Sequence, residues 1–303
     1  MTTEPTFIAS LRALATHPAA RGLADDAAVL GDLVLTHDVI VEGVHFLSRD
    51  PPGDVAWKLL AVNLSDLAAK GATPLGCLMG YTLSGNESWD AAFIAGLGVA
   101  LGALDLPLLG GDTVSVPPGT PRSLGLTALG RAPAGGAPSR SGARPGDALW
   151  VTGTIGAAGI GLARAQAGDD PSDPCVLAYR RPQPRLAAGR ALAPHVTAMM
   201  DVSDGLLIDA GRMAAASGVA IAIELGAVPV VDSAPAGLAG ILAAVTAGDD
   251  YELLFTLPDG VMPPDLAVPV RRIGGITAGT GLSLTHEAVP VPLPTRLGYI
   301  HAS

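Results

Sequence analysis

The chain has 303 residues, of which 49% are hydrophobic and 15% charged, so it is long enough and apolar enough to fill the cores of two globular domains. Its formal net charge of −10, with no cluster of basic residues, argues against nucleic-acid binding, which needs a positive face. The longest apolar run, residues 91–104, is too short to cross a bilayer, so we expect no membrane partner.

Cysteine usage indicates the compartment. The two cysteines, Cys77 and Cys175, are far apart in the sequence and fit no metal-binding spacing. The first residues also lack the uninterrupted apolar segment of a secretory signal peptide. We therefore expect reduced thiols and a cytoplasmic protein.

Strands and helices alternate along the first half of the chain. The predicted elements are a helix over 6–16, a strand over 33–36 that leads into Asp38, a helix from Asp54, a strand over 75–83, a helix over 88–104, a short strand into 110–115 and a strand over 124–130. This order predicts an α/β or α+β fold.

Residues 131–147 are rich in Gly, Pro and Arg and contain few apolar side chains, which is typical of a connection between domains. We place the linker at 136–147, between an N-terminal domain over 1–135 and a C-terminal α/β domain over 148–303. For the second half we predict a strand, a Gly-rich turn and a helix over 148–166, a helix over 186–193, a loop and helix over 201–218, strands over 219–225, 251–257 and 268–276, and a mostly extended tail.

The Gly-rich turn at Gly153, Gly156, Gly159 and Gly161 follows a strand and precedes a helix, as a dinucleotide-binding turn does. Its spacing is not G-x-G-x-x-G, and the acids at 169 and 170 come too early for the ribose contact. Close strand-to-helix packing is the better explanation of these glycines.

The helix from Asp54 carries the central candidate, Asp66. Asp54 is a suitable N-cap and Gly71 a suitable end. Asn63, Asp66 and Lys70 form a narrow polar stripe opposite an apolar face. Taken alone, Asp66 would be a solvated carboxylate on an exposed surface.

Aspartates beside Gly, Ser or another Asp recur where apolar segments meet loops, which is where sites are usually built. Singly, each could cap a helix or close a turn: Asp201 or Asp204 could cap the helix that follows, and Asp112 could close a turn. As a set they favour binding Mg²⁺, which prefers short, hard oxygen ligands. The chain has only two lysines, Lys58 and Lys70, and no P-loop, so phosphate chemistry here is expected to depend on metal and not on lysine.

The segments ADDAAV (24–29), VEGVHF (41–46), NLSDLAAKGATP (63–74), GGDT (110–113), SRSGARPGD (139–147), D-x-SDGL (201–206) and GDDYEL (248–253) occur in this order over nearly the whole chain. Together they resemble the thiamine-monophosphate kinase family, which belongs to a superfamily with aminoimidazole ribonucleotide synthetase and selenophosphate synthetase. The resemblance implies ATP- and Mg²⁺-dependent phosphorylation of thiamine monophosphate to thiamine diphosphate, several Mg²⁺ ions, and a homodimer formed through N-terminal domains of mixed-sheet type.

The resemblance also assigns roles to residues. The implied metal ligands are Asp26, Thr36, His37, Asp38, Asp66, Asp112, Asp201 and Asp204, of which Asp66, Asp112 and Asp204 are also implied to be catalytic. The implied nucleotide contacts are Gly111, Asp112, Arg140 and Ser203. The implied substrate contacts are His45, Asp249 and Tyr299.

Some of these assignments rest on the resemblance alone. From the residues themselves, His45 could equally be a half-buried strand histidine and Tyr299 a surface residue of the tail. The chain also departs from the family pattern, with Ala24 in place of a Gly before the Asp pair, His37 in place of a small hydroxyl residue and Asp249 in place of a Glu.

Two alternatives stay open. One is a superfamily enzyme with a different acceptor, although selenophosphate synthetase is disfavoured because the first 40 residues contain no Cys. The other is a nucleotide- or metal-binding protein without catalytic activity.

Overall fold

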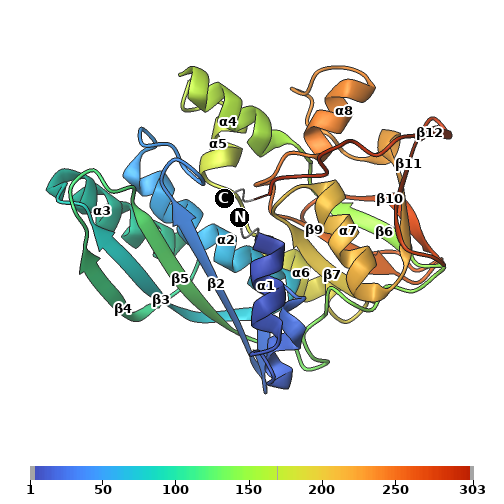
Figure 1. Cartoon of the computed structure of the whole chain (residues 1–303), viewed down its shortest axis with the longest axis horizontal. Helices are drawn as coiled ribbons and strands as arrows, with labels where there is room; N and C mark the ends of the chain where they lie inside the picture. Colours follow the sequence, from blue (N-terminus) through green and yellow to red (C-terminus); the bar gives the residue numbers. More distant parts are fainter. Residues whose placement is uncertain (1–3, 169, 301–303) are drawn as a thin grey trace.

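The computed structural model describes residues 4–168 and 170–300, so residues 1–3, Asp169 and residues 301–303 lie outside it. The N-terminal elements are α1 (Glu4–Arg12), the 3-10 helix η1 (Pro18–Leu23), β1 (Ala28–Leu30), β2 (Leu33–Val41), α2 (Pro52–Ala69), β3 (Thr73–Leu83), α3 (Glu87–Ala103), β4 (Leu108–Ser115) and β5 (Ser123–Arg131). Figure 1 shows β2 to β5 and α3 in one of two lobes, with α1 near the middle of the molecule.

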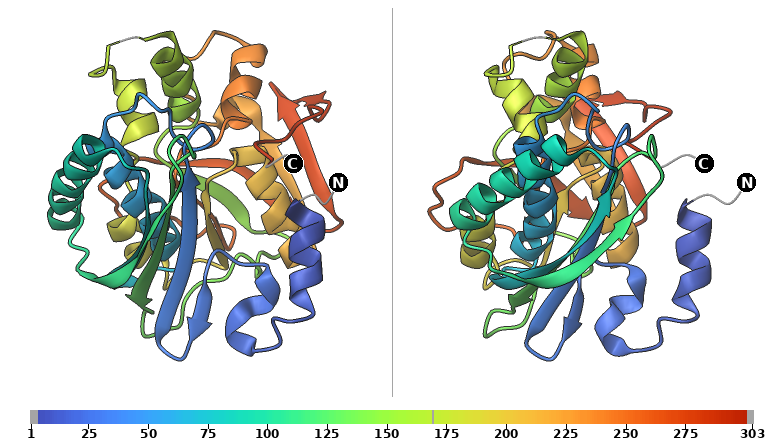
Figure 2. Two further views of the ribbon diagram at one scale, coloured as in Figure 1. Left: turned by 60° about the vertical axis from the view of Figure 1, so that its left-hand side comes forward. Right: turned by 90° about the vertical axis from the view of Figure 1, so that its left-hand side faces the viewer.

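The N-terminal sheet has the order β1-β2-β5-β3-β4 and is mixed, because β3 and β4 are parallel while the other neighbours are antiparallel. Alternate residues of β2 and β5 are buried, including Val34, Ile40, Leu124 and Leu126, as expected for strands with one face in a core. Helices α2 and α3 cover that face (Figure 2).

The C-terminal elements are β6 (Ala148–Thr152), α4 (Ala157–Ala167), α5 (Pro174–Arg180), α6 (Leu186–Leu192), β7 (Ala198–Val202), α7 (Leu206–Ser217), β8 (Ala220–Glu224), the 3-10 helix η2 (Leu225–Ala227), α8 (Leu238–Val245), β9 (Glu252–Leu257), β10 (Val270–Thr277), β11 (Gly281–His286) and β12 (Val289–Val291). They build a seven-stranded mixed sheet of order β12-β11-β8-β10-β6-β9-β7. Two α/β domains were predicted, and the two mixed sheets confirm that class.

Helix α2 lies between the two domains. Its Leu59, Leu60 and Leu64 pack into the N-terminal core, while Ala68 and Ala69 belong to a cluster on the C-terminal sheet. The polar stripe of Asn63, Asp66 and Lys70 does not face solvent, since Asn63 and Lys70 are fully buried. A helix with buried neighbours on all sides cannot be recognised from one polar stripe.

The start of α2 also differs from the prediction. Pro51 is the N-cap residue, and Asp54 lies inside the first turn, where its buried carboxylate accepts from Arg181 at 2.5 Å. Asp54 therefore does not cap the helix, and instead forms an ion pair between α2 and the segment after α5. Gly71, with φ of 59°, follows the helix end as predicted.

The glycines that follow β6 and continue into α4 are packing residues. A Cβ at Gly153 would lie 1.9 Å from Glu252 Oε1, and one at Gly161 would lie 1.8 Å from Cys175 O. Strand β6 is antiparallel to both neighbours, whereas a dinucleotide-binding unit needs parallel strands. These observations exclude the dinucleotide-binding interpretation.

Helices α5 and α8 were not predicted, because Pro-rich and short apolar segments gave no clear helical period. Both cysteines are buried free thiols, in line with the expected reduced state. Among the described residues, no helix is both long and apolar enough to cross a bilayer.

Candidate active site

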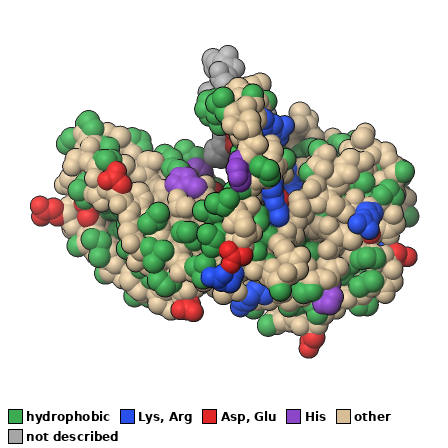
Figure 3. Space-filling view, turned by 90° about the horizontal axis from the view of Figure 1, so that it is seen from below, with side chains coloured by type: hydrophobic (Ala, Val, Ile, Leu, Met, Phe, Trp, Pro, Cys, Tyr) green, Lys and Arg blue, Asp and Glu red, His purple; other side chains and the backbone are tan. Residues whose placement is uncertain are grey.

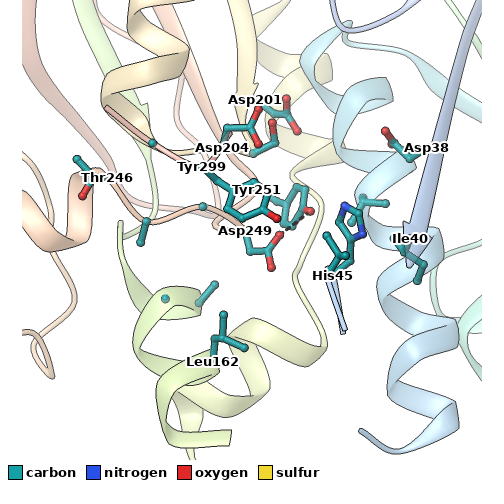
Figure 4. Close-up of a pocket in the computed structure, with 18 of the residues that line it drawn as sticks. Asp38, Ile40, His45, Leu162, Asp201, Asp204, Thr246, Asp249, Tyr251 and Tyr299 are labelled. Carbon is teal, nitrogen blue, oxygen red and sulfur yellow. Dashed lines mark hydrogen bonds between the residues drawn. The ribbon is translucent and has the colours of Figure 1, made fainter. Parts of the chain in front are cut away.

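A cleft of about 570 Å³ lies between the domains, and both contribute to its walls. The N-terminal domain supplies Asp38 from β2, the following loop with His45, and Asp66 from α2. The C-terminal domain supplies the loop after β7, the segment before β9, the start of α4 and the tail. Figure 3 shows the hollow between the two lobes, and Figure 4 shows the labelled side chains facing it.

A second cavity of about 270 Å³ adjoins the cleft. It is lined by η1, the Asp25–Asp26 pair and the middle of β2. Asp38 and Asp66 line both cavities, so these two carboxylates mark the boundary between them.

The alternation of β2 decides which of its polar residues face this boundary. Thr36 and Asp38 lie on the side of α2, where the Thr36 hydroxyl donates to Asp66 and the Asp38 backbone N–H donates to Asn63 Oδ1 at 3.1 Å. His37 points to the opposite face, where its Nδ1 lies 2.9 Å from Thr127 Oγ1. The His37 ring therefore contacts Thr127, although His37 is also among the residues that line the second cavity.

Asp66 is partly buried at the cleft and is not a solvated surface carboxylate. Burial, reinforced by the nearby carboxylates of Asp38, Asp201 and Asp26, raises its pKa well above the usual range. Burial and the charges of Asp26 and Asp204 likewise raise the pKa of Asp38 to about 6. These shifts show several acids close enough to repel one another.

Asp201 and Asp204 come from the end of β7 and the loop after it. Asp201 is buried and accepts from Ser65 Oγ at 2.6 Å, and burial together with Asp26 raises its pKa to about 8. Neither acid caps α7, because Gly205 is the N-cap residue and no side chain caps it. The capping explanation is thus wrong for both, and they are available at the cleft.

Asp209, which sequence reasoning missed, holds the loop that carries Ser203 and Asp204. Its Oδ2 accepts the backbone N–H groups of Ser203, Asp204 and Gly205 at 3.0–3.2 Å. Arg212 donates to both Asp209 Oδ1, at 2.7 Å, and Asp204 Oδ2. The available sequence signal for Asp209 was an Asp in the first turn of the helix that follows D-x-SDGL.

The Asp25–Asp26 pair is surrounded by cations, contrary to the expectation that the acids lack lysine partners. Lys70 Nζ contacts Asp25 and lies 2.8 Å from Asp26 Oδ2, and Arg140 from the predicted linker contacts Asp26. Arg21 lies 2.6 Å from Asp25. Burial alone would raise the pKa of Asp25, but Lys70 and Arg21 bring it down to about 2.

The other lysine lies on the far side of the cleft. Lys58 is buried, and its Nζ lies 2.6 Å from Asp249 Oδ2 and donates to the backbone O of His45 at 2.9 Å. The second carboxylate oxygen of Asp249 accepts from the Tyr251 hydroxyl at 3.0 Å. His45, Asp249 and Tyr299 all line the cleft, and the Tyr299 N–H donates to Asp204 O at 2.8 Å.

Gly111 and Asp112 lie elsewhere. They belong to the exposed strand β4, which pairs only with β3 at the sheet edge farthest from β1 (Figure 1). Three strand spacings separate β4 from β2, about 14 Å. A single chain therefore does not bring Asp112 to the other acids, and the expectation of one intramolecular cage holding all of them is wrong. Gly111 has a packing reason of its own, since a Cβ there would lie 1.9 Å from Met79 O.

The described residues contain no group of three or more His, Cys, Asp or Glu side chains already arranged to hold a metal ion. The chemistry of the donors nevertheless fits a divalent cation. The carboxylates of Asp38, Asp66 and Asp201 repel one another. Mg²⁺ would relieve this repulsion.

Comparison with known proteins places this fold and cleft in a class. The family described as AIR synthase related protein matches with its N-terminal domain over residues 24–132 and its C-terminal domain over 144–286. The chain is an AIR synthase related protein.

Within that class the relatives agree. The thiamine-monophosphate kinase of Caulobacter vibrioides is 38% identical over 94% of this chain and 86% of its own length. A solved structure described as AaThiL complexed with AMPPCP and TMP matches with a TM-score of 0.86 at 27% identity, over 99% of this chain and 97% of that one. The thiamine-monophosphate kinase of Stenotrophomonas maltophilia K279a matches with a TM-score of 0.76 at 35% identity, over 94% and 96%. The chain belongs to the thiamine-monophosphate kinase family.

Proposed function

We infer that this chain transfers the γ-phosphoryl group of ATP to thiamine monophosphate, giving thiamine diphosphate and completing thiamine diphosphate biosynthesis. Membership of the family supports the reaction, and the AaThiL complex with AMPPCP and TMP supports both ligands. The observation in this chain that carries the proposal is the cleft between the domains, where Asp38 and Asp66 of one domain and Asp201 and Asp204 of the other line one cavity.

The acceptor needs no general base. A phosphate monoester is already anionic near neutral pH, so the obstacle to its attack is repulsion between two anions. Arg140 and Ser203 are proposed nucleotide contacts. Arg140 is suited to bind phosphate, because its guanidinium is charged at any working pH and Asp26 raises its pKa further against the effect of burial.

The larger cleft is the proposed site of thiamine monophosphate. His45 and Asp249 lie on its walls, and Tyr251 and Tyr299 are the aromatic side chains beside them (Figure 4). The thiazolium ring of thiamine is positively charged, so it is attracted to the faces of tyrosine rings and to a carboxylate. We propose these residues as the substrate contacts.

Thr36, Asp38, Asp66, Asp201 and Asp204 are the residues of one chain proposed to hold Mg²⁺, whereas the carboxylate of Asp26, the other predicted ligand on this side, contacts Lys70 and Arg140. Bound Mg²⁺ would neutralise these oxygens and lower the repulsion between donor and acceptor phosphates. Ser65 and Thr36 orient Asp201 and Asp66, and Arg212 orients Asp204. A cytoplasmic location is likewise proposed, on the two free thiols and the use of ATP.

A homodimer through the N-terminal domains would complete the site. Strands β3 and β4 of the N-terminal sheet expose apolar side chains, among them Leu78, Leu83, Leu108, Leu109 and Val114. A surface of this kind is typical of an interface. In such a dimer, Gly111 and Asp112 on the exposed β4 of one chain would reach the cleft of the partner. We therefore still propose both as nucleotide contacts and Asp112 as a metal ligand.

Incubation with thiamine monophosphate, ATP and Mg²⁺, followed by chromatography, tests the reaction. We expect thiamine diphosphate and ADP in equal amounts. ADP formed only with another phosphorylated acceptor would overturn the substrate assignment. Binding of ATP without ADP formation from any acceptor would favour a binding protein that has lost catalysis.

A further inference from the structure

Lys70 is a cation built into the acidic site. It follows the last turn of α2, and its side chain has no exposed surface. Its Nζ contacts Asp25 Oδ1, lies 2.8 Å from Asp26 Oδ2 and donates to Met199 O at 3.3 Å. An ammonium group is buried this completely only where negative partners compensate it.

The charges around the Asp25–Asp26 pair are fully compensated. Three cationic side chains, Lys70, Arg21 and Arg140, contact these two carboxylates. The contact with Asp26 Oδ2 is a charge contact without hydrogen-bond geometry, since that atom has no hydrogen-bond partner in the described structure. Lys70 therefore acts on Asp26 as a metal ion would, through charge and proximity.

The acids on the other side of the boundary lack such compensation. The carboxylates of Asp66 and Asp201 accept from neutral hydroxyls, those of Thr36 and Ser65. No salt bridge to Asp38, Asp66 or Asp201 occurs among the described residues. The site is thus divided into a part neutralised by protein cations and a part that needs added cations.

We propose that Lys70 occupies the position between Asp25 and Asp26 that a divalent ion would otherwise take, so that this site binds one ion fewer than its carboxylates could hold. The identity of that ion as Mg²⁺ rests on the proposed function, whereas the role of Lys70 does not. In this proposal Lys70 serves the acidic site as a fixed cation and not as a P-loop lysine.

Counting bound Mn²⁺ by electron paramagnetic resonance tests this without turnover. Lys70→Met removes the charge while keeping a long apolar side chain, and we expect it to bind about one more Mn²⁺ per chain than the unmodified protein. An unchanged count in folded Lys70→Met overturns the proposal. Lys58→Met is the matched control, because Lys58 pairs with Asp249 and not with an Asp pair, so its Mn²⁺ count should stay unchanged.

Asp25→Asn provides a second test that does not depend on the folding of Lys70→Met. If Lys70 excludes metal from this position, removing the Asp25 charge leaves the Mn²⁺ count unchanged. Loss of one ion from Asp25→Asn would show that Asp25 is itself a metal ligand and would overturn the proposal. Since neither count requires thiamine monophosphate or ATP, failure of the proposed kinase reaction would leave both results interpretable.

Discussion

The Nζ atom of Lys58, on α2, lies 2.6 Å from Oδ2 of Asp249, on the segment before β9, and joins the two domains at the cleft. The same ammonium donates to the backbone O of His45 and lies 4.2 Å from the centroid of the Tyr179 ring. One buried cation therefore fixes two proposed substrate contacts that come from different domains. Asp249 has a positive φ of 69°, so this position is held against its backbone preference.

The first prediction concerns Lys58→Met. Without the ammonium, Asp249 loses its charged partner and the loop of His45 loses a hydrogen bond, so both contacts move from their positions. We expect KM for thiamine monophosphate to rise about tenfold or more, with a smaller change in KM for ATP, since a hydrogen bond to a charged group contributes about 1.5–3 kcal/mol. Steady-state kinetics with each substrate varied in turn measures this difference.

Arg131→Met is the control for Lys58→Met, because it removes a cation from the exposed Arg131–Asp32 pair, far from the cleft. Exposed pairs contribute about 0–1 kcal/mol, so neither KM nor stability should change measurably. Equal increases in both KM values for Lys58→Met would indicate a general loss of structure and would contradict the positioning role.

The second prediction is that Asp66→Asn gains stability without metal and loses activity. The amide removes one of several mutually repelling charges, yet it can still accept from the Thr36 hydroxyl. In EDTA we expect a higher unfolding midpoint than that of the unmodified protein. With Mg²⁺ and substrates we expect kcat to fall by about a hundredfold or more, because a neutral amide is a poor Mg²⁺ ligand.

Asp265→Asn, at an exposed position, is the matched control and should change neither quantity. Differential scanning fluorimetry with EDTA and with Mg²⁺ separates the two effects of Asp66→Asn. Unchanged turnover in that variant would remove Asp66 from the site, and lower stability in EDTA would show that its charge is compensated in the folded protein.

The sequence predicted the fold class and most elements because the apolar segments and their Gly and Pro boundaries are local signals. Strand β2 and helix α3 follow from such patterns. The pattern of aspartates predicted a shared metal site, but which of them meet, such as Asp38, Asp66 and Asp201, depends on how the two domains pack. No local pattern encodes the distance between β2 and the end of β7.

The partners of the lysines could not be predicted at all. Lys70 reads as a surface residue on a helical wheel, and only the packing of α2 between two sheets buries it beside Asp25 and Asp26. The prediction that Asp112 joins the other acids within one chain was wrong for a related reason. Its GGDT segment fits the family, but strand order places β4 at the sheet edge.

The third prediction concerns Asp209→Asn. A single carboxylate oxygen accepts three backbone N–H groups of the loop that carries Asp204, while the other accepts from Arg212. The amide keeps one acceptor but turns its NH₂ group toward Arg212, so the loop and Asp204 lose their fixed position. We expect about 2 kcal/mol lower stability and a higher Mg²⁺ concentration for half-maximal activity, measured by urea unfolding and by metal titration of the rate.

Glu224→Gln is a suitable comparison, because Glu224 also accepts backbone N–H groups, from Gly226 and Glu287, but lies outside both cavities. It should lower stability without changing the Mg²⁺ requirement. If Asp209→Asn lowered stability alone, the residue would be structural only and would not position Asp204.

The fourth prediction tests whether Asp112 serves the cleft of a second chain. Asp66 and Asp112 cannot meet within one chain, so in the proposed homodimer each site combines Asp66 of one protomer with Asp112 of its partner. Asp66→Asn and Asp112→Asn should each be inactive as homodimers. After mixing, unfolding and refolding, half of the dimers are mixed and each has one intact site, so activity should recover to about a quarter of the unmodified value by symmetry. Refolding each variant alone should restore nothing. If the mixture stayed inactive while size-exclusion chromatography showed dimers, Asp112 would not act across the interface, and an active Asp112→Asn homodimer would exclude the residue from the site.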